Sequence, residues 1–225
     1  DIYNVENVAE RDDFISLDKE QNEQILYNET LLTQLEEDNM NAKLKELQNW
    51  KTQNVYIEEN DQGQFCISVR WVLSKKLIDN VMTVKARLCA RGFEEIQNFR
   101  TDSPCCSRVG IRIVLMIIAS KSWKLQSIDV KTAFLQGKEI ERTVYLRPPK
   151  EAKTKNIWKL RKCVYGLADA SRYWYLRVKE ELIKLGAVVN KFDQGIFCWF
   201  EGHNLIGVLI CHVDDMIWGG TNSFK

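Results

Sequence analysis

The sequence is poor in the residues that mark several common classes of protein. Its 225 residues include only three prolines and 11 glycines, which excludes a collagen-like or linker-like chain. The longest apolar runs, 113–119 and 205–211, are seven residues each, whereas a membrane-spanning helix needs about 18. The first residues also lack the charged and apolar regions of a secretory signal. With 45% hydrophobic residues, the composition instead predicts a globular protein with a sizeable core.

Cysteine pairs and histidines are also scarce. The seven cysteines are an odd number, none belongs to a C-x-x-C pair, and most lie in apolar segments. This usage predicts reduced, buried thiols rather than disulfides. His203 and His212 are the only histidines, so a zinc site built from cysteine and histidine is not expected.

The net charge of +1 conceals an uneven distribution. Residues 1–62 hold 5 Lys and Arg against 16 Asp and Glu, whereas residues 63–225 hold 27 against 15. A basic body behind an acidic segment favours a polyanionic partner. The acidic part can also be read simply as a solvated helix, and the two interpretations are compatible.

The spacing of apolar residues predicts an α+β fold, because helices and strands intermix without regular βαβ alternation. Residues 1–22 are read as a poorly ordered lead-in. Helices are expected over 23–50, with a break near Asp38, over 111–120 and over 167–185, the last ending at Gly186 as a C-cap. Strands are expected over 55–59, 66–74, 81–90, 125–130, 143–146, 196–200, 205–212 and 216–218.

Carboxylates interrupt two of the apolar segments. Asp214 and Asp215 stand together inside an expected hairpin, and Asp129 lies near the end of the 125–130 strand. Adjacent like charges repel near a sheet of low dielectric, although an exposed hairpin tip would hold both at little cost. A divalent cation would neutralise the repulsion, and oxygen ligands with few histidines favour Mg²⁺ over zinc. One carboxylate on a strand and two on a neighbouring hairpin suit two-metal phosphoryl transfer.

Six segments between residues 71 and 221 match one family in its own order. They are 85–93 (KARLCARGF), Ser103-Pro104 before the helix with Ile111-Arg112, 129–137 (DVKTAFLQG), 144–149 (VYLRPP), 160–167 (LRKCVYGL) and 212–215 (HVDD). Each is weak alone, but together they resemble the reverse transcriptase domain of Ty1/copia-type LTR retrotransposon Pol polyproteins.

The resemblance implies an RNA-directed DNA polymerase, in which a primer 3′-hydroxyl attacks the α-phosphorus of a dNTP. It implies a right-hand polymerase fold with fingers and a partial palm built on an antiparallel sheet, and with the thumb absent. Asp129, Asp214 and Asp215 correspond to the catalytic, metal-binding triad, and the carbonyl of Val130 to a further ligand of two Mg²⁺ ions, with Mn²⁺ as an alternative. The implied partners are an RNA or DNA template with its primer, dNTPs, and the integrase and RNase H domains of the polyprotein, with no membrane.

The resemblance also implies a nucleotide site. Phe134 falls where the family places an aromatic steric gate under the incoming sugar, although it can also be read as an ordinary core residue. Lys85, Arg87 and Arg91 alternate along one strand and would compensate triphosphate charge, or form a solvated strand face. Tyr165 and Gly166 would lie beside the new base pair, with the glycine allowing close backbone approach.

Contacts to nucleic acid are implied at Arg172, and Arg177 and Lys179 could follow template phosphates or remain surface charges. His212, expected against the primer, replaces the tyrosine usual before Val-Asp-Asp in the family, and its titratable ring could alter the pH dependence. Further departures are Ala168 and Ser171 for the usual Lys and Pro, and Cys105-Cys106 where valines are preferred. No departure removes a metal ligand.

We expect an acidic lead-in and helix over 1–50 and the polymerase region over 51–225. The chain begins with Asp1 and stops ten residues past Asp215, so we expect a fragment that is weakly active or inactive alone but retains Mg²⁺ affinity. One alternative is a degenerate or domesticated remnant that binds nucleic acid without polymerising. Another is an interaction module built on the acidic helix. The resemblance implies the cytoplasm, within virus-like particles, or the nucleus.

Overall fold

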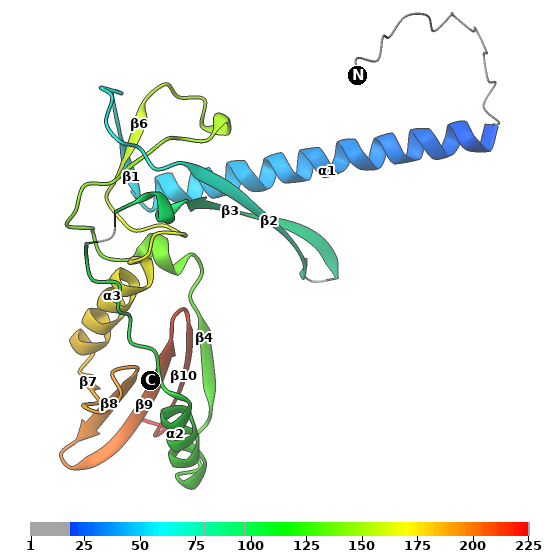
Figure 1. Cartoon of the computed structure of the whole chain (residues 1–225). Helices are drawn as coiled ribbons and strands as arrows, with labels where there is room; N and C mark the ends of the chain where they lie inside the picture. Colours follow the sequence, from blue (N-terminus) through cyan, green and yellow to red (C-terminus); the bar gives the residue numbers. More distant parts are fainter. Residues whose placement is uncertain (1–18, 79, 97, 225) are drawn as a thin grey trace, which may run out of the picture.

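The computed structural model describes residues 19–78, 80–96 and 98–224, and it mixes helices with antiparallel sheets (Figure 1). A long helix, α1 (Lys19–Thr52), runs into an upper part that contains two small sheets, and a five-stranded sheet forms the lower part. The α+β prediction is therefore confirmed at this level. None of the described helices is long and apolar enough to cross a membrane.

Helix α1 is continuous, so the predicted break near Asp38 is wrong. The helix contains neither Gly nor Pro, and Gln34 donates to the Asp38 carboxylate one turn later at 3.2 Å. It begins at Lys19, earlier than expected, and the rest of the predicted lead-in lies outside the described residues. From residue 30 onward, where the burial of its side chains is described, the helix is buried only near its C-terminal end, where Leu47 and Trp50 enter the upper core.

The upper part holds a three-stranded sheet in the order β1 (Tyr56–Glu59), β6 (Ile157–Leu160), β5 (Tyr145–Leu146). Beside it, β2 (Val69–Ile78) and β3 (Val81–Ala90) form a hairpin that projects below α1 in Figure 1. Buried side chains from α1, β3, β5 and β6 make one upper core, which includes Trp50, Leu88, Leu146 and Trp158.

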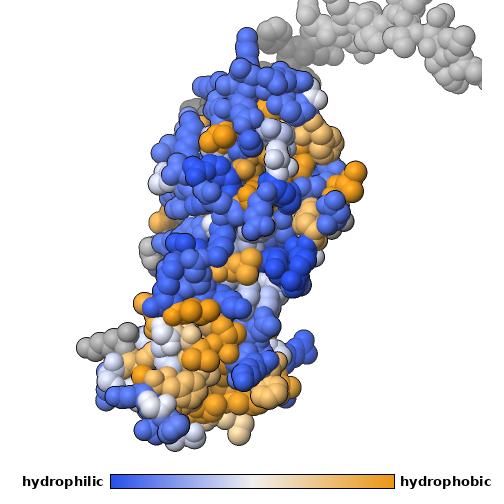
Figure 2. Space-filling view, turned by 90° about the vertical axis from the view of Figure 1, so that its left-hand side faces the viewer, coloured by the Kyte–Doolittle hydropathy of each residue, from blue (hydrophilic) through white to orange (hydrophobic). Residues whose placement is uncertain are grey.

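The lower sheet has the order β4 (Gln126–Asp129), β10 (Asp215–Gly220), β9 (Asn204–His212), β8 (Ile196–Glu201), β7 (Val188–Val189). Helix α3 (Ala170–Lys184) packs on one face through Trp174, Tyr175 and Val178, and α2 (Arg108–Ser120) packs on the other through Val114 and Ile118. The sheet therefore lies between the two helices, and the packing on both faces holds it in place relative to α2 and α3. Figure 2 shows hydrophobic side chains gathered over this lower part.

Several predicted boundaries shift for local reasons. Helix α2 begins at Arg108 because the Ser107 hydroxyl accepts from the Gly110 amide at 3.0 Å, an N-cap that the apolar pattern did not reveal. The 66–74 strand is displaced to β2, the 143–146 strand shrinks to two residues, and the predicted 167–185 helix starts only at Ala170. Strands β6 and β7 were not predicted. Gly186 ends α3 with φ +84°, as expected of a C-cap.

The cysteines follow the predicted burial only in part. All seven cysteines lie within the described residues and carry free thiols. Cys106, Cys163 and Cys211 are buried, while Cys105 is exposed. Burial raises the pKa of the Cys211 thiol to about 12, so this group remains protonated at neutral pH.

Candidate active site

Asp129 and Asp215 come together because their strands pair in register. Asp129 ends β4 and Asp215 begins β10, and the two residues are directly opposite in the antiparallel pair. Directly opposite residues project to the same face of a sheet, with Cβ atoms roughly 5 Å apart. On the other strand of the hairpin, His212 is the partner of Asp215. The register therefore aligns His212, Asp215 and Asp129 in a row across three strands.

This row faces the α2 side of the sheet. Met216, the next residue after Asp215, is buried against α3, and Ile217 packs with the α2-side cluster. Because side chains alternate along a strand, Asp215 projects to the same side as Ile217. Helix α2 packs on this face through Val114 and Ile118, and Ile118 lies over Gly219 on β10. The two carboxylates are left open to solvent at the upper end of the sheet.

Asp214 occupies the two-residue turn between β9 and β10, after Val213. Of the two turn residues only Val213 has a positive φ, +59°, which is the pattern of a type II′ hairpin turn. The Asp214 carbonyl accepts from the Val130 amide at 3.2 Å, which ties the turn to the residue after Asp129. Thus all three aspartates and Val130 belong to one corner of the lower sheet.

The three aspartates are exposed. No Lys, Arg or His in the described part of the chain forms an ion pair with any of them. They are therefore not members of an ordinary ion-pair network. Equally, among the described residues no three His, Cys, Asp or Glu side chains are arranged to hold one metal ion together. The backbone places Asp129, Asp214 and Asp215 at one corner of the sheet. That their carboxylates converge on shared metal ions stays a prediction.

The basic residues predicted for the triphosphate lie in the upper part. Lys85 and Arg87 are exposed on β3 and alternate with Ala86 and Leu88, which are buried, so the shared face is present. Arg91 comes after the end of β3 and is not part of that strand, because the chain turns there into the short 3₁₀ helix Gly92–Glu94. Lys85 and Arg87 thus share a strand face as predicted, whereas the prediction that Arg91 continues the same strand is wrong.

Arg87 is part of an aromatic cluster with Tyr165 and Phe134. Its guanidinium lies over the Tyr165 ring, 5.5 Å from the centroid, and the Tyr165 and Phe134 rings meet edge to face at 5.0 Å. Phe134 lies in the 3₁₀ helix η2 (Ala133–Gln136), half-buried between the upper core and the α3-side cluster. The cluster therefore links β3 to the segment that follows Asp129.

Gly166 brings two backbones into contact. It has φ +93°, and a Cβ atom built on it would lie 2.0 Å from the carbonyl oxygen of Ala90. The Ala90 amide donates to the Tyr165 carbonyl at 2.7 Å. The backbone at Gly166 thus approaches β3 closely, and its predicted place beside a base pair stays a prediction.

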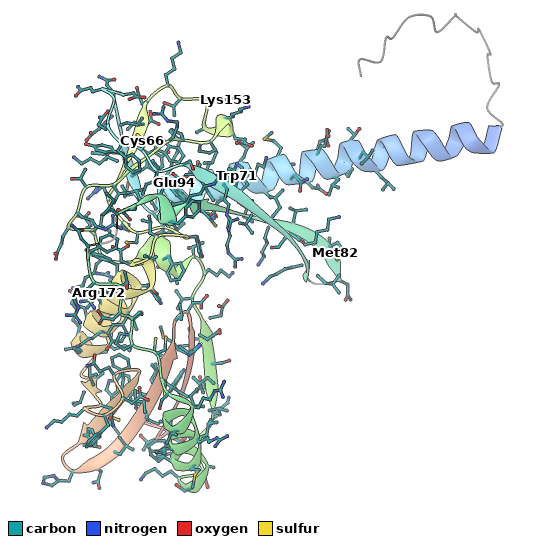
Figure 3. All side chains as sticks on the ribbon, viewed as in Figure 1. Cys66, Trp71, Met82, Glu94, Lys153 and Arg172 are labelled. Atoms are coloured by element: carbon teal, nitrogen blue, oxygen red, sulfur yellow. The ribbon has the colours of Figure 1, made fainter. Side chains whose placement is uncertain are left out.

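The basic residues of α3 lie on the opposite side of the sheet from Asp129 and Asp215. Arg172, labelled in Figure 3, donates to the carboxylate and the carbonyl oxygen of Asp102, each at 3.1 Å. Arg177 pairs with Glu181 at 3.2 Å. Their predicted contacts with nucleic acid stay predictions, and in the folded chain these two guanidinium groups have protein partners.

A cavity of about 390 Å³ also lies on the α3 side, lined by Gln53, Gln136, Lys162, Trp174, Arg177, Val178, Glu181, Leu182 and Met216. It is behind the sheet, because Trp174 and Met216, which line it, belong to the α3-side cluster. The cavity is therefore distinct from the corner that holds the aspartates.

Sequence reasoning missed Trp174. This residue is 5% exposed, and its indole Nε1 donates to the Val213 carbonyl at 2.7 Å. The signal was a tryptophan on the inward face of a predicted helix, because a buried indole N–H requires an acceptor. The identity of that acceptor could not be read from the sequence.

Comparisons with known proteins agree with the motif order. Residues 53–225 match the family described as "Reverse transcriptase (RNA-dependent DNA polymerase)". The chain is 31% identical over 165 residues to "Retrovirus-related Pol polyprotein from transposon RE2" of Arabidopsis thaliana, which is 70% of this chain and 11% of that protein. It is 30% identical over 195 residues to the Pol polyprotein from transposon TNT 1-94 of Nicotiana tabacum, with 81% and 14% covered.

A yeast protein is similar over nearly the same region. "Transposon Ty1-MR1 Gag-Pol polyprotein" of Saccharomyces cerevisiae is 28% identical over 187 residues, which is 80% of this chain and 10% of that protein. The chain thus spans only 10% to 14% of the length of these relatives.

Proposed function

The chain belongs to the reverse transcriptase (RNA-dependent DNA polymerase) family of copia-type Pol polyproteins, and from this premise we propose that it carries the nucleotidyl-transfer centre of such a polyprotein. The observation that carries the proposal is the register that sets Asp129 opposite Asp215, next to the turn that holds Asp214. The substrates would be dNTPs and a primer paired with an RNA or DNA template.

Asp129, Asp214, Asp215 and the carbonyl of Val130 would hold two divalent cations. The donor set fits this role, because it consists of hard oxygen atoms that lie on one corner of the sheet without competing cationic partners among the described side chains. When bound, the metal ions would activate the primer hydroxyl and stabilise the charge of the triphosphate. The protein itself would supply a rigid sheet that holds the carboxylates at a fixed spacing.

Lys85 and Arg87 would lie against the triphosphate, and Phe134 would exclude a 2′-hydroxyl. Support comes from the contact of Arg87 with Tyr165 and of Tyr165 with Phe134, which joins the basic strand to the segment after Asp129. Arg91 and Gly166 lie near the end of β3, where the backbone of Tyr165 and Gly166 contacts Ala90, and they would complete the nucleotide pocket.

The two parts of the structure suit a right-hand polymerase. The β2–β3 hairpin and the upper core would serve as fingers, and the lower sheet with α2 and α3 would serve as the palm. In this arrangement the end of β4 and the turn between β9 and β10, which carry the aspartates, belong to the palm end that is nearest the upper part (Figure 1). The integrase and RNase H activities of a Pol polyprotein would lie in other segments of such a polyprotein.

The decisive experiment is primer extension on an RNA template with dNTPs and Mg²⁺, performed with the chain and with the corresponding full-length polyprotein. We expect Asp214→Asn to abolish extension, because the carboxylate serves the metal ions and not the core. Removal of an essential catalytic group costs roughly 10³-fold or more in rate. Mn²⁺ titration of the chain alone should show weaker binding in the same variant.

Glu201→Gln provides the matched control, because Glu201 is an exposed acid at the other end of the same sheet. It should leave extension, Mn²⁺ binding and unfolding unchanged. If Asp214→Asn extends primers like the parent, the assignment of the site is wrong. If the unaltered chain and polyprotein bind primer and template but never extend, the alternative of a nucleic-acid-binding remnant is favoured; the exposed, ungathered carboxylates are compatible with that alternative.

A further inference from the structure

We propose that Trp174 is a positioning residue that holds the Val213–Asp214 turn in the conformation required for metal binding. The inference rests on the proposed function, because it assigns a role to Asp214. It concerns a residue on α3, behind the sheet, that makes no contact with the face on which Asp129 and Asp215 project.

The turn needs an external restraint because its backbone is unfavourable. Val213 has φ +59°, a region that glycine enters freely but that a β-branched side chain strongly disfavours. The first position of a type II′ turn is normally glycine for this reason. Without additional contacts, the 213–214 peptide units would relax toward other turn geometries, and the Asp214 side chain would change direction with them.

The restraint is visible at both carbonyl groups of the turn. The Val213 carbonyl accepts from Trp174 Nε1 at 2.7 Å, and the Asp214 carbonyl accepts from the Val130 amide at 3.2 Å. One donor comes from α3 behind the sheet and the other from the chain just after β4. Because each carbonyl is held from outside the hairpin, the orientations of two successive peptide planes are fixed, and Asp214 lies between them.

The anchoring tryptophan is largely buried. Trp174 is 5% exposed and belongs to the same buried cluster as Met216 and Cys211, which face each other on the two strands one position beyond His212 and Asp215. The Cys211 thiol lies 3.5 Å from the same Val213 carbonyl and serves as a second, weaker donor. Loss of the indole donor would therefore leave the Val213 carbonyl without its principal donor from the protein.

The chain offers a close control in Trp199. Its indole Nε1 donates to the Leu185 carbonyl at 2.9 Å, it is 8% exposed, and it belongs to the same α3-side cluster. Leu185 follows α3 and is not part of the turn. Trp174→Phe and Trp199→Phe therefore remove equivalent hydrogen bonds and similar volumes, and only the first affects the turn.

The experiment measures amide hydrogen exchange of residues 212–216 and Mn²⁺ affinity in the full chain, together with urea unfolding. We expect Trp174→Phe to accelerate exchange in this segment and to weaken Mn²⁺ binding, each by about three- to tenfold, which corresponds to one hydrogen bond. Trp199→Phe should shift the urea midpoint by a similar amount but leave both readouts at the parent level.

Adding Val213→Gly tests the role of the strain. Glycine adopts the positive φ without the anchor, so the double variant should recover most of the Mn²⁺ affinity that Trp174→Phe loses. In the full-length polyprotein the Trp174→Phe variant should lower kcat with little change in the KM for dNTP. The inference is overturned if Trp174→Phe and Trp199→Phe give the same exchange and the same Mn²⁺ affinity, or if Val213→Gly rescues nothing.

Failure of this inference is distinguishable from failure of the proposed function. If Asp214→Asn binds Mn²⁺ as the parent does, the metal assignment fails, whereas faster exchange in Trp174→Phe would still identify the anchor. If Asp214→Asn loses Mn²⁺ and Trp174→Phe does not, the site stands and the positioning role is refuted.

Discussion

At the scale of single residues, Gly166 carries the clearest steric requirement. We expect Gly166→Ala to lower the free energy of unfolding by more than about 2 kcal/mol, because it adds the cost of a positive φ to a clash with the Ala90 backbone. Urea unfolding followed by far-UV circular dichroism would measure the change. The clash cannot be relieved by a side-chain rotation, since the opposing atom is a main-chain oxygen.

Gly63→Ala is the matched control for this prediction. Gly63 has φ +85° but no atom within 4 Å of the position of its missing Cβ. Its substitution therefore measures only the cost of a positive φ, which we expect to be about 1 kcal/mol in the free energy of unfolding. If both variants lose the same free energy of unfolding, the backbones at Gly166 and Ala90 can move apart at no cost, and the predicted clash is wrong.

At the scale of elements, Glu46 makes the packing of α1 on β3 dependent on pH. The side chain is 5% exposed and accepts from Trp50 Nε1 at 3.2 Å. Burial raises the pKa of its carboxyl, although hydrogen bonds oppose that change. The folded state therefore binds a proton more tightly than the unfolded state, and stability should fall as the pH rises from the ordinary glutamate pKa through the folded value.

Glu46→Gln should flatten this part of the pH profile, because glutamine has no proton to lose. The measurement is the free energy of unfolding in urea between pH 4 and pH 7 for the parent and the variant. Glu201→Gln removes the same charge from an exposed position and should leave the slope unchanged. Parallel profiles for the parent and Glu46→Gln would contradict a raised pKa at this residue.

Elements with strong local patterns were predictable from the sequence, and elements defined by tertiary contacts were not. The alternation over 81–90 predicted β3 with its exact bounds, and the 205–218 pattern predicted the β9–β10 hairpin. In contrast, β6 exists because β1 and β5 pair with its two edges, which no local pattern encodes. The register of Asp129 with Asp215 and the anchor at Trp174 depend on the same long-range packing. The resemblance to the family indicated which residues to consider for the site, but only the folded structure shows how they are placed relative to one another.

At the scale of the whole molecule, Arg142 joins the upper and lower parts. Its guanidinium forms a bidentate pair with Asp169, just before α3, with both distances 2.9 Å, and it also pairs with Glu95, in the segment after β3. The Asp169 carboxylate is 1% exposed, and the Phe99 ring lies 4.1 Å from the guanidinium carbon. One cation thus pairs with two carboxylates that come from different parts of the chain.

We expect Arg142→Met to destabilise the protein by about 3–5 kcal/mol, because it leaves buried carboxylates without their counter-charge. Arg161→Met, which breaks an exposed pair with Glu139, should cost less than about 1 kcal/mol. Adding Asp169→Asn to Arg142→Met should recover part of the lost stability, because the neutral amide needs no counter-charge when it is buried. Hydrogen exchange in β6 and β9 would show whether the upper and lower cores then open separately. If Arg142→Met and Arg161→Met are equally mild, the two parts are held together by apolar packing, and the position of Lys85 and Arg87 relative to the aspartates does not depend on this ion cluster.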